Sequence, residues 1–156
     1  MAKSTPATQA LDRAGVAYVL TTYDYDPDAE RVGLQAAEAL GVPAGEVLKT
    51  LMVLADGKPV CVILASDREV AMKRLAAALG AKTCEMMKPA DAERVTGYRV
   101  GGVSPFGQKR AVRTVVDADA AALDEGFVNA GQRGLQARLA PGDMVRVLGA
   151  IVAAVS

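Results

Sequence analysis

Residues 47–65, Val-Leu-Lys-Thr-Leu-Met-Val-Leu-Ala-Asp-Gly-Lys-Pro-Val-Cys-Val-Ile-Leu-Ala, decide the fold of this chain. Two apolar runs, 48–55 and 59–65, flank Asp56-Gly57-Lys58, and this arrangement is typical of a β-hairpin. After Thr50 nearly every residue of both runs is apolar, so other elements should cover both faces of the hairpin. The stretch therefore predicts two central strands of a buried sheet.

Helices and strands alternate on either side of this hairpin. We expect helices that begin at Thr5-Pro6, near residue 31, at Ser66-Asp67, at Pro89 and at Pro141, four of them ending before Gly15, Gly41, Gly80 and Gly97. Further strands are predicted at residues 16–23, 82–86, 98–102, 113–117, 127–130 and 133–139. Short strands with peripheral helices predict a single α/β domain over residues 1–156, built on a mixed, curved sheet.

The composition excludes several kinds of site. The 156 residues include no histidine, which excludes Ser-His and Cys-His nucleophile pairs, histidine zinc ligands and a histidine general base. The two cysteines, Cys61 and Cys84, lie in apolar or strand-like settings and are interpreted as buried small hydrophobes. We expect no metal and no cofactor. The chain has no hydrophobic signal core and no apolar run long enough to span a membrane, so we expect a cytoplasmic protein.

The charge balance restricts how a nucleic acid would bind. The chain has 18 basic and 18 acidic residues and a net charge of zero, so a polyanion would need a local basic patch. Candidate contacts are Lys73, Arg74, Lys109, Arg110 and Arg113. The last three follow a glycine-rich loop, although a solvated loop has the same composition.

Three features could form a site. Gly101 and Gly102 open a Gly-Gly-Val-Ser-Pro-Phe-Gly loop whose backbone N–H groups could point at an anion or a carbonyl oxygen, or which could simply be a tight turn. Lys49 begins an apolar strand, where it either contacts an anion or ligand or extends its ammonium group to solvent. Tyr23 and Tyr25 share one face of a strand end, where they either stack on a base or cover the core.

Taken in order along the chain, these motifs resemble one family. They are Tyr23, Val-Leu-Lys-Thr-Leu at 47–51, Leu-Gly-Ala-Lys at 79–82, Thr-Gly-Tyr-Arg-Val-Gly-Gly-Val-Ser-Pro-Phe-Gly-Gln-Lys at 96–109 and Val-Val-Asp at 115–117. The combination resembles the YbaK family of aminoacyl-tRNA deacylases, which are related to the inserted editing domain of bacterial prolyl-tRNA synthetases. The resemblance covers nearly the whole chain and implies that family's barrel-like form of the mixed sheet.

The resemblance also implies a reaction and the residues for it. The expected reaction is hydrolysis of mischarged tRNA, with Cys-tRNA(Pro) as the leading substrate. Lys49 would anchor the substrate near the terminal adenosine and the ester, and Gly101 and Gly102 would lie against the aminoacyl carbonyl. Backbone N–H groups of Gly102 and Val103 would stabilise the oxyanion. Further substrate contacts are expected from Tyr23, Tyr25, Thr50, Ser104, Pro105 and Gln136.

The chain departs from the family pattern at three positions. Tyr25 replaces a histidine, Gln136 replaces an aspartate and Arg113 replaces a proline. The change at Gln136 bears most directly on the pocket and leaves the substrate amino acid open.

Two other functions therefore remain. One is removal of another small aminoacyl group, alanine or serine, by an ordered water. The other is a non-catalytic module that binds tRNA or a synthetase. The resemblance implies that tRNA(Pro) is selected through association with prolyl-tRNA synthetase, and we expect the protein itself to be a monomer.

Overall fold

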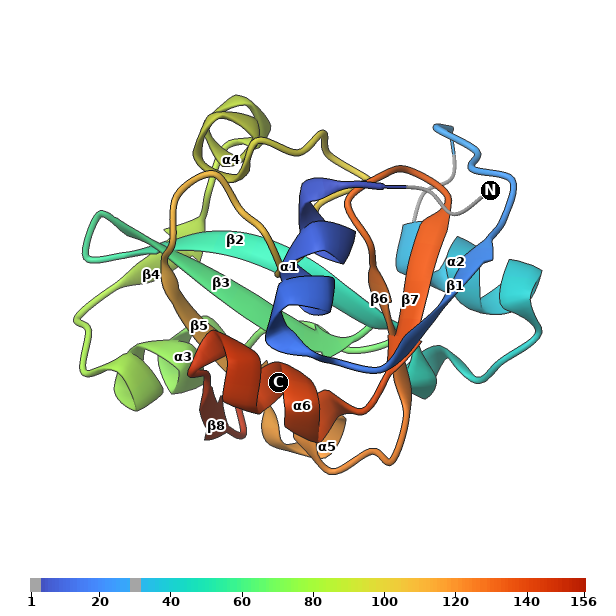
Figure 1. The fold of residues 1–156 in the computed structure, drawn as a ribbon. Coiled ribbons are helices and arrows are strands. Elements are labelled where there is room, and N and C mark those ends of the chain that lie inside the picture. The colour runs from blue at the N-terminus through green and yellow to red at the C-terminus, as the bar shows by residue number, and fades with distance from the viewer. Residues whose placement is uncertain (1–3, 29–31) are drawn as a thin grey trace.

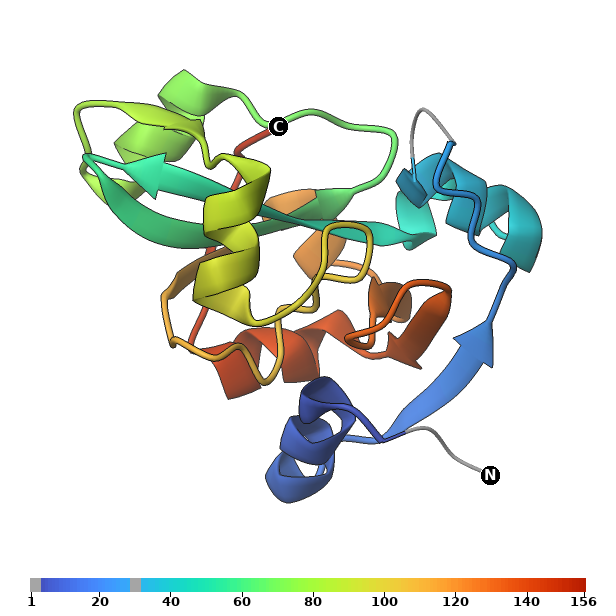
Figure 2. The same ribbon diagram turned by 90° about the horizontal axis from the view of Figure 1, so that it is seen from above.

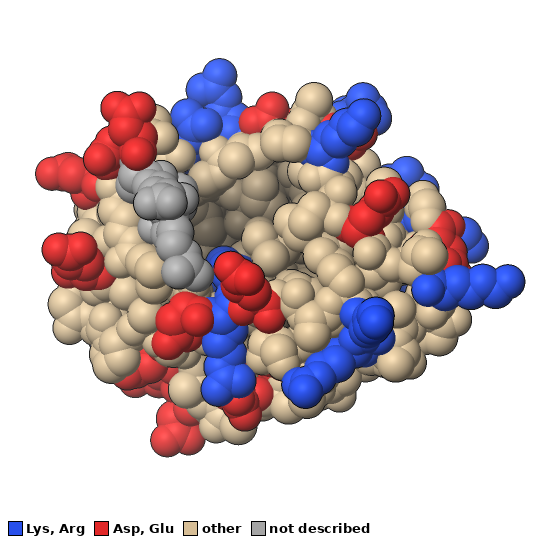
Figure 3. Space-filling view, turned by 180° about the vertical axis from the view of Figure 1, so that it is seen from behind, with Lys and Arg blue, Asp and Glu red and all other residues tan. Residues whose placement is uncertain are grey.

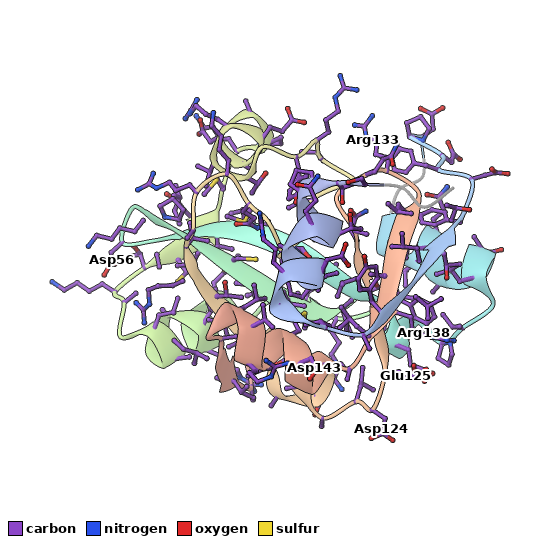
Figure 4. All side chains as sticks on the ribbon, in the orientation of Figure 1. Asp56, Asp124, Glu125, Arg133, Arg138 and Asp143 are labelled. Carbon is purple, nitrogen blue, oxygen red and sulfur yellow. The ribbon has the colours of Figure 1, made fainter. Side chains whose placement is uncertain are left out.

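The predicted hairpin is present at the centre of the fold. The computed structural model describes residues 4–28 and 32–156. Strands β2 (Leu48–Ala55) and β3 (Lys58–Ala65) pair antiparallel along their whole length. Asp56 and Gly57 connect them with φ angles of 48° and 78°, the left-handed pair that a two-residue hairpin turn requires. Asp56, labelled at the tip in Figure 4, also accepts the N–H groups of Lys82 and Thr83, each at 3.0 Å.

A five-stranded mixed sheet is built on this hairpin. Its order is β4-β2-β3-β5-β8, with β4 at Cys84–Met86, β5 at Arg113–Asp117 and β8 at Ile151–Ala153. The β4-β2-β3 part is antiparallel, whereas β5 and β8 continue the sheet in parallel. The strand prediction at 113–117 is confirmed. β8 was not predicted.

A second, antiparallel sheet lies beside the first (Figure 1). Its order is β1-β7-β6, with β1 at Tyr18–Thr22, β7 at Leu135–Leu139 and β6 at Gly126–Asn129. Between the two sheets only the parallel bridge of Val47 to Phe127 joins the described residues. The mixed α/β class is therefore confirmed, and the described strands do not close into a barrel. β2 pairs with β3 along one edge, and β4 takes residues 53–55 of the other edge. β6 meets that second edge at Val47, just before β2, and the two sheets stay separate.

Helices cover both faces of the large sheet, as Figures 1 and 2 show together. Helix α1 (Pro6–Ala14), helix α6 (Pro141–Leu148) and the side chains of Cys61 and Ile63 share one core cluster. Helix α3 (Met72–Leu79) packs on the opposite face with Val60, Val62 and Leu64. This alternation explains why nearly every residue of β3 is apolar. The remaining helical segments are α2 (Val32–Leu40), η1 (Ala44–Glu46), α4 (Pro89–Thr96) and α5 (Ala118–Ala121).

Two local predictions are wrong, and residue 31, the predicted start of the second helix, lies outside the described residues. Ser66 does not cap the third helix, which begins at Met72, because its hydroxyl donates to the carbonyl of Val47 at 2.6 Å. Residues 98–102 do not form a strand, since the Gly102 N–H turns back to the Arg99 carbonyl at 2.8 Å. Within the described chain, every helix is too short or too polar to cross a membrane.

Candidate functional site

A cavity of about 330 Å³ lies where the two sheets, α4 and the glycine loop meet. Figure 3 shows a hollow on this side of the molecule, seen from behind relative to Figure 1. The walls come from the loop after β1, the first half of β2, the start of α4, the glycine loop and the ends of β6 and β7. The site is thus assembled from segments more than 100 residues apart in the chain.

Six of the residues singled out in the sequence line this cavity. They are Tyr23, Lys49, Thr50, Gly101, Val103 and Gln136. Strand pairing brings these residues together. Lys49 and Thr50 lie on β2, whereas Gln136 lies on β7, which pairs with β1 and β6 so that Gln136 is opposite Thr21 and Asn129.

Most of the cavity wall is apolar. Three methionines, Met52, Met86 and Met87, contribute to it together with aliphatic residues of β2 and the glycine loop. Lys49, partly buried, is the only charged residue among the described residues of the wall. Such a cavity suits a ligand with an uncharged body and one anionic or electron-rich group near Lys49.

Three buried polar atoms of the wall, the Tyr23 hydroxyl, Thr50 Oγ1 and Gln136 Oε1, make no hydrogen bond of good geometry with the described residues, although the side chains of Tyr23 and Gln136 lie close enough to interact. Leaving such atoms unpaired is costly, and Gln136 is only 5% exposed. Burial raises the pKa of Tyr23 above its ordinary value, while the neighbouring Gln136 side chain acts in the opposite direction. Tyr23 therefore stays a neutral phenol at neutral pH, and the three atoms form a polar group for a ligand to satisfy.

The glycine loop needs glycine at both positions. Gly101 has φ of +89°, and a Cβ there would lie 2.5 Å from the Tyr25 hydroxyl. A Cβ on Gly102 would lie 2.8 Å from the backbone nitrogen of Arg133. The Gly102 N–H is already used in its bond to Arg99, so the expected Gly102 oxyanion donor is not available in this structure. The N–H groups of Gly101 and Val103 make no hydrogen bond with the described residues, and both residues line the cavity.

Asn129 holds this loop in place, and sequence reasoning missed it. Its side-chain amide donates to the carbonyls of Gly101 at 3.3 Å and Gln132 at 3.1 Å. Its oxygen accepts the N–H groups of Gly131 at 2.7 Å and Gln132 at 3.2 Å. One side chain therefore organises the β6–β7 turn and ties it to the glycine loop. Asparagine before a glycine turn was the only local signal.

Arg133 makes a second link from the same turn. Its Nε donates to the Val100 carbonyl at 2.9 Å, and its guanidinium lies over the Tyr25 ring, 5.2 Å from the centroid. Figure 4 shows Arg133 at the upper edge of the molecule, near the loop that follows β1. Tyr25 thus packs against the outside of the loop, whereas Tyr23 lines the cavity.

The remaining predicted residues lie outside this cavity. Ser104 is buried, with its Oγ accepting the Phe106 N–H at 3.2 Å, and Pro105 is buried beside it. Among the basic residues, Lys73 and Arg74 are exposed on α3, Arg113 begins β5, and Lys109 and Arg110 follow the glycine loop. The backbone N–H groups of Lys109 and Arg110 bond to the end of α4. Their role in tRNA binding remains a prediction.

Neither cysteine lines the cavity. Cys61 is buried in β3, and desolvation raises the pKa of its thiol to about 12. Cys84 is partly exposed in β4, with its pKa also raised by burial. A thiol that stays protonated is a poor nucleophile, so neither cysteine is suited to attack a substrate.

Comparisons with known proteins agree on one type of domain. The model of the aminoacyl-tRNA editing domain matches residues 26–147. EbsC of Enterococcus faecalis, described as a Cys-tRNA(Pro)/Cys-tRNA(Cys) deacylase, is 39% identical over 106 residues, which are 67% of this chain and 65% of EbsC. A proline–tRNA ligase of Nitratidesulfovibrio vulgaris is 39% identical over 80 residues, 51% of this chain and 14% of the ligase. The matched parts thus span less than two thirds of these relatives.

Solved structures show the same fold. The hypothetical protein APE2540 superposes with a TM-score of 0.86 at 24% identity, covering 97% of this chain and 99% of that protein. A protein described as a trans-editing enzyme for prolyl-tRNA synthetase superposes with a TM-score of 0.82 at 21% identity, covering 99% of each chain.

Proposed function

The chain belongs to the aminoacyl-tRNA editing domain family, and from this we propose that it is a deacylase of mischarged tRNA. We propose further that residues 1–156 act as one editing domain and that Cys-tRNA(Pro) is the leading substrate. The name of EbsC supports this substrate, and the similarity to proline–tRNA ligases supports a link to proline tRNA.

The cavity carries this proposal, because its three unpaired polar atoms face an otherwise apolar wall with one lysine. An aminoacyl adenosine combines a small side chain, an ester and several hydroxyl and amino groups. Its polar groups would satisfy Tyr23, Thr50 and Gln136, and its aminoacyl side chain would lie against the methionines. Lys49 would hold the electron-rich oxygens near the ester.

Catalysis would depend on the glycine loop. The tetrahedral intermediate of ester cleavage carries a negative oxygen, and fixed backbone N–H groups stabilise such an oxyanion. The N–H groups of Gly101 and Val103 take this role in place of the Gly102 and Val103 pair expected from the sequence.

The attacking group would come from the substrate or from water. Among the described residues of the wall, Tyr23 and Lys49 are the only side chains that titrate, and burial keeps Tyr23 protonated. With a cysteinyl ester, the substrate sulfur attacks its own carbonyl and forms a cyclic thioester. The ester C–O bond breaks and the thiol proton ends on the ribose oxygen. Water then opens the ring. Holding both groups in one molecule favours this attack.

Because of Gln136, alanyl and seryl esters are tested as a second substrate class. The wall has an amide where the resembling family has a carboxylate, so the preference among cysteine, alanine and serine rests on this chain's own residues. Alanyl and seryl esters lack a thiol and would need an ordered water. Selection of tRNA(Pro) would come from prolyl-tRNA synthetase as a partner, because the net charge of zero gives little general attraction for RNA.

A deacylation panel tests the proposal. The purified protein is incubated with Cys-tRNA(Pro), Ala-tRNA(Pro), Ser-tRNA(Pro) and Pro-tRNA(Pro), and loss of the ester is followed with time. We expect Cys-tRNA(Pro) to be cleaved fastest and Pro-tRNA(Pro) to be spared. Lys49→Ala should lower kcat/KM by about 100-fold or more, the usual cost of losing an electrostatic group at such a site.

Two results would separate the alternatives. Cys84→Ser, a change outside the cavity, serves as the matched control and should keep wild-type activity. Turnover of Ala-tRNA(Pro) or Ser-tRNA(Pro) above the cysteinyl substrate would replace self-attack with water attack. Binding of tRNA without loss of any ester would establish the non-catalytic module instead.

A further inference from the structure

A second cavity, of about 190 Å³, lies on the other side of the glycine loop. Gly102 lines it, whereas Gly101, the preceding residue, lines the first cavity. Two consecutive residues have Cα atoms about 3.8 Å apart, so the loop is a thin wall between the two spaces. A ligand that continues past the loop edge from the first cavity would enter the second.

The second cavity is basic. Arg99 and Arg133 line it, and no carboxylate is among its described lining residues. Neither arginine forms an ion pair with the described part of the chain. Glu93 reaches the same loop, but its carboxylate accepts the Val100 N–H at 2.9 Å. Two arginines therefore line the cavity, and neither is neutralised by a carboxylate of the described residues.

Arg133 is also oriented in advance. Its Nε donates to the Val100 carbonyl, and its guanidinium carbon lies 5.2 Å from the centroid of the Tyr25 ring. The four N–H donors of its two terminal nitrogens make no hydrogen bond within the described residues. A guanidinium fixed in this way matches the paired oxygens of a phosphate, and three glycines at positions 97, 102 and 131 leave the space unfilled by side chains.

We propose that this second cavity binds a backbone phosphate of the tRNA acceptor strand, next to the terminal aminoacyl adenosine in the first cavity. The proposal rests on the proposed function, because it places the ester in the first cavity. The site is new relative to the sequence analysis, which did not include Arg99 or Arg133 among the candidate tRNA contacts. Those were Lys73, Arg74, Lys109, Arg110 and Arg113. The proposal also explains how a chain of zero net charge holds RNA: by a local pair of arginines at the site.

Arg99→Gln is the sharpest test, because Arg133 has a second role in holding the loop. Arg99 is exposed and its side chain makes no hydrogen bond with the described residues, so removing its charge should leave the fold intact. Arg94→Gln is the matched control: it removes the same charge from an exposed site on α4, where Arg94 pairs with Asp91. Each variant is assayed with Cys-tRNA(Pro) and with cysteinyl adenosine, which carries the same ester and no phosphate.

The expected result separates the two substrates. Arg99→Gln should raise KM for the tRNA by about tenfold at low salt with kcat unchanged, and the slope of log(kcat/KM) against log salt should shrink by about 0.7, the value for one phosphate contact to a single strand. Cysteinyl adenosine should react with Arg99→Gln as with wild type. Equal losses on both substrates, or a loss on tRNA no larger than that of Arg94→Gln, would overturn the phosphate site.

A binding measurement keeps this test independent of catalysis. A hairpin RNA ending in an uncharged single-stranded CCA is titrated with each protein, and fluorescence anisotropy gives Kd. Weaker binding by Arg99→Gln than by Arg94→Gln supports the phosphate site even where no ester is cleaved, a result that would reject only the proposed deacylase. Equal Kd values reject the phosphate site whatever the activity. Competition by inorganic phosphate alone, with no difference between the variants in RNA binding, would assign the cavity to a free anion.

Discussion

Asn129 is the residue whose removal should best separate holding the glycine loop from catalysing the reaction. In Asn129→Ala the four hydrogen bonds to Gly101, Gly131 and Gln132 are lost together. Each contributes about 0.5–1.5 kcal/mol net, and the bonds at 3.2 and 3.3 Å belong at the low end. The free energy of unfolding should therefore fall by about 2–4 kcal/mol.

Activity should fall further than stability alone explains. Without the tie to its carbonyl, Gly101 is free to shift, and a displacement near 1 Å in a catalytic group can cost about 100-fold. We expect kcat for deacylation to fall by about 10- to 100-fold at temperatures where the variant is fully folded, with a smaller change in KM. Thermal unfolding and single-turnover deacylation on the same samples provide the two readouts.

Asn129→Asp divides the side chain into its two halves. The carboxylate can still accept the N–H groups of Gly131 and Gln132, but it cannot donate to the carbonyl of Gly101 and repels it instead. This variant should lose kcat at least as much as Asn129→Ala. Glu69→Ala, at an exposed residue that lines neither cavity, is the control. Wild-type kcat in a folded Asn129→Asp protein would refute the tie to Gly101.

Two further predictions concern the loop and its support. Gly102→Ala should destabilise the fold by about 1–3 kcal/mol, because the new Cβ would lie 2.8 Å from a backbone atom of Arg133 and 3.0 Å from one of Gln132. The control Gly142→Ala, in α6, places its Cβ more than 4 Å from any neighbour and should be neutral or stabilising. Chemical denaturation of both variants checks this prediction. Tyr98 donates to the Phe106 carbonyl at 2.6 Å, and burial raises its pKa to about 12 from the usual 10. The unfolded chain ionises first, so wild-type stability should fall between about pH 10 and 12, and Tyr98→Phe should lack this part of the fall while being about 1 kcal/mol less stable at neutral pH. An identical alkaline profile in both proteins would contradict this assignment.

Local patterns in the sequence predicted most of the elements. The Asp56-Gly57 turn and the flanking apolar runs predicted the hairpin because turn geometry and strand burial are properties of neighbouring residues. The glycine-rich loop and Lys49 were recognisable for the same reason, and both lie at one cavity. The absence of histidine excluded a histidine general base and histidine zinc ligands.

What the sequence left open depended on pairing between distant segments. Ser66 looked like a helix cap, but the fold brings the Val47 carbonyl to its hydroxyl. Residues 98–102 have strand-like composition, but the Gly102 N–H bonds back to the Arg99 carbonyl, and none of the described strands pairs with them. The resemblance implied a barrel-like sheet, whereas the described strands form two sheets that meet at the bridge of Val47 to Phe127.

The site itself shows the same division. The sequence identified Tyr23, Lys49, Gly101 and Gln136 as candidate site residues, because each was recognisable from its own residue type and its neighbours in the chain. Tertiary structure alone decided that three unpaired polar atoms share one cavity and that Gly102 is not a free donor. It also decided that Asn129 braces the loop, because hydrogen bonds between segments far apart in the chain depend on strand register, which no local pattern specifies.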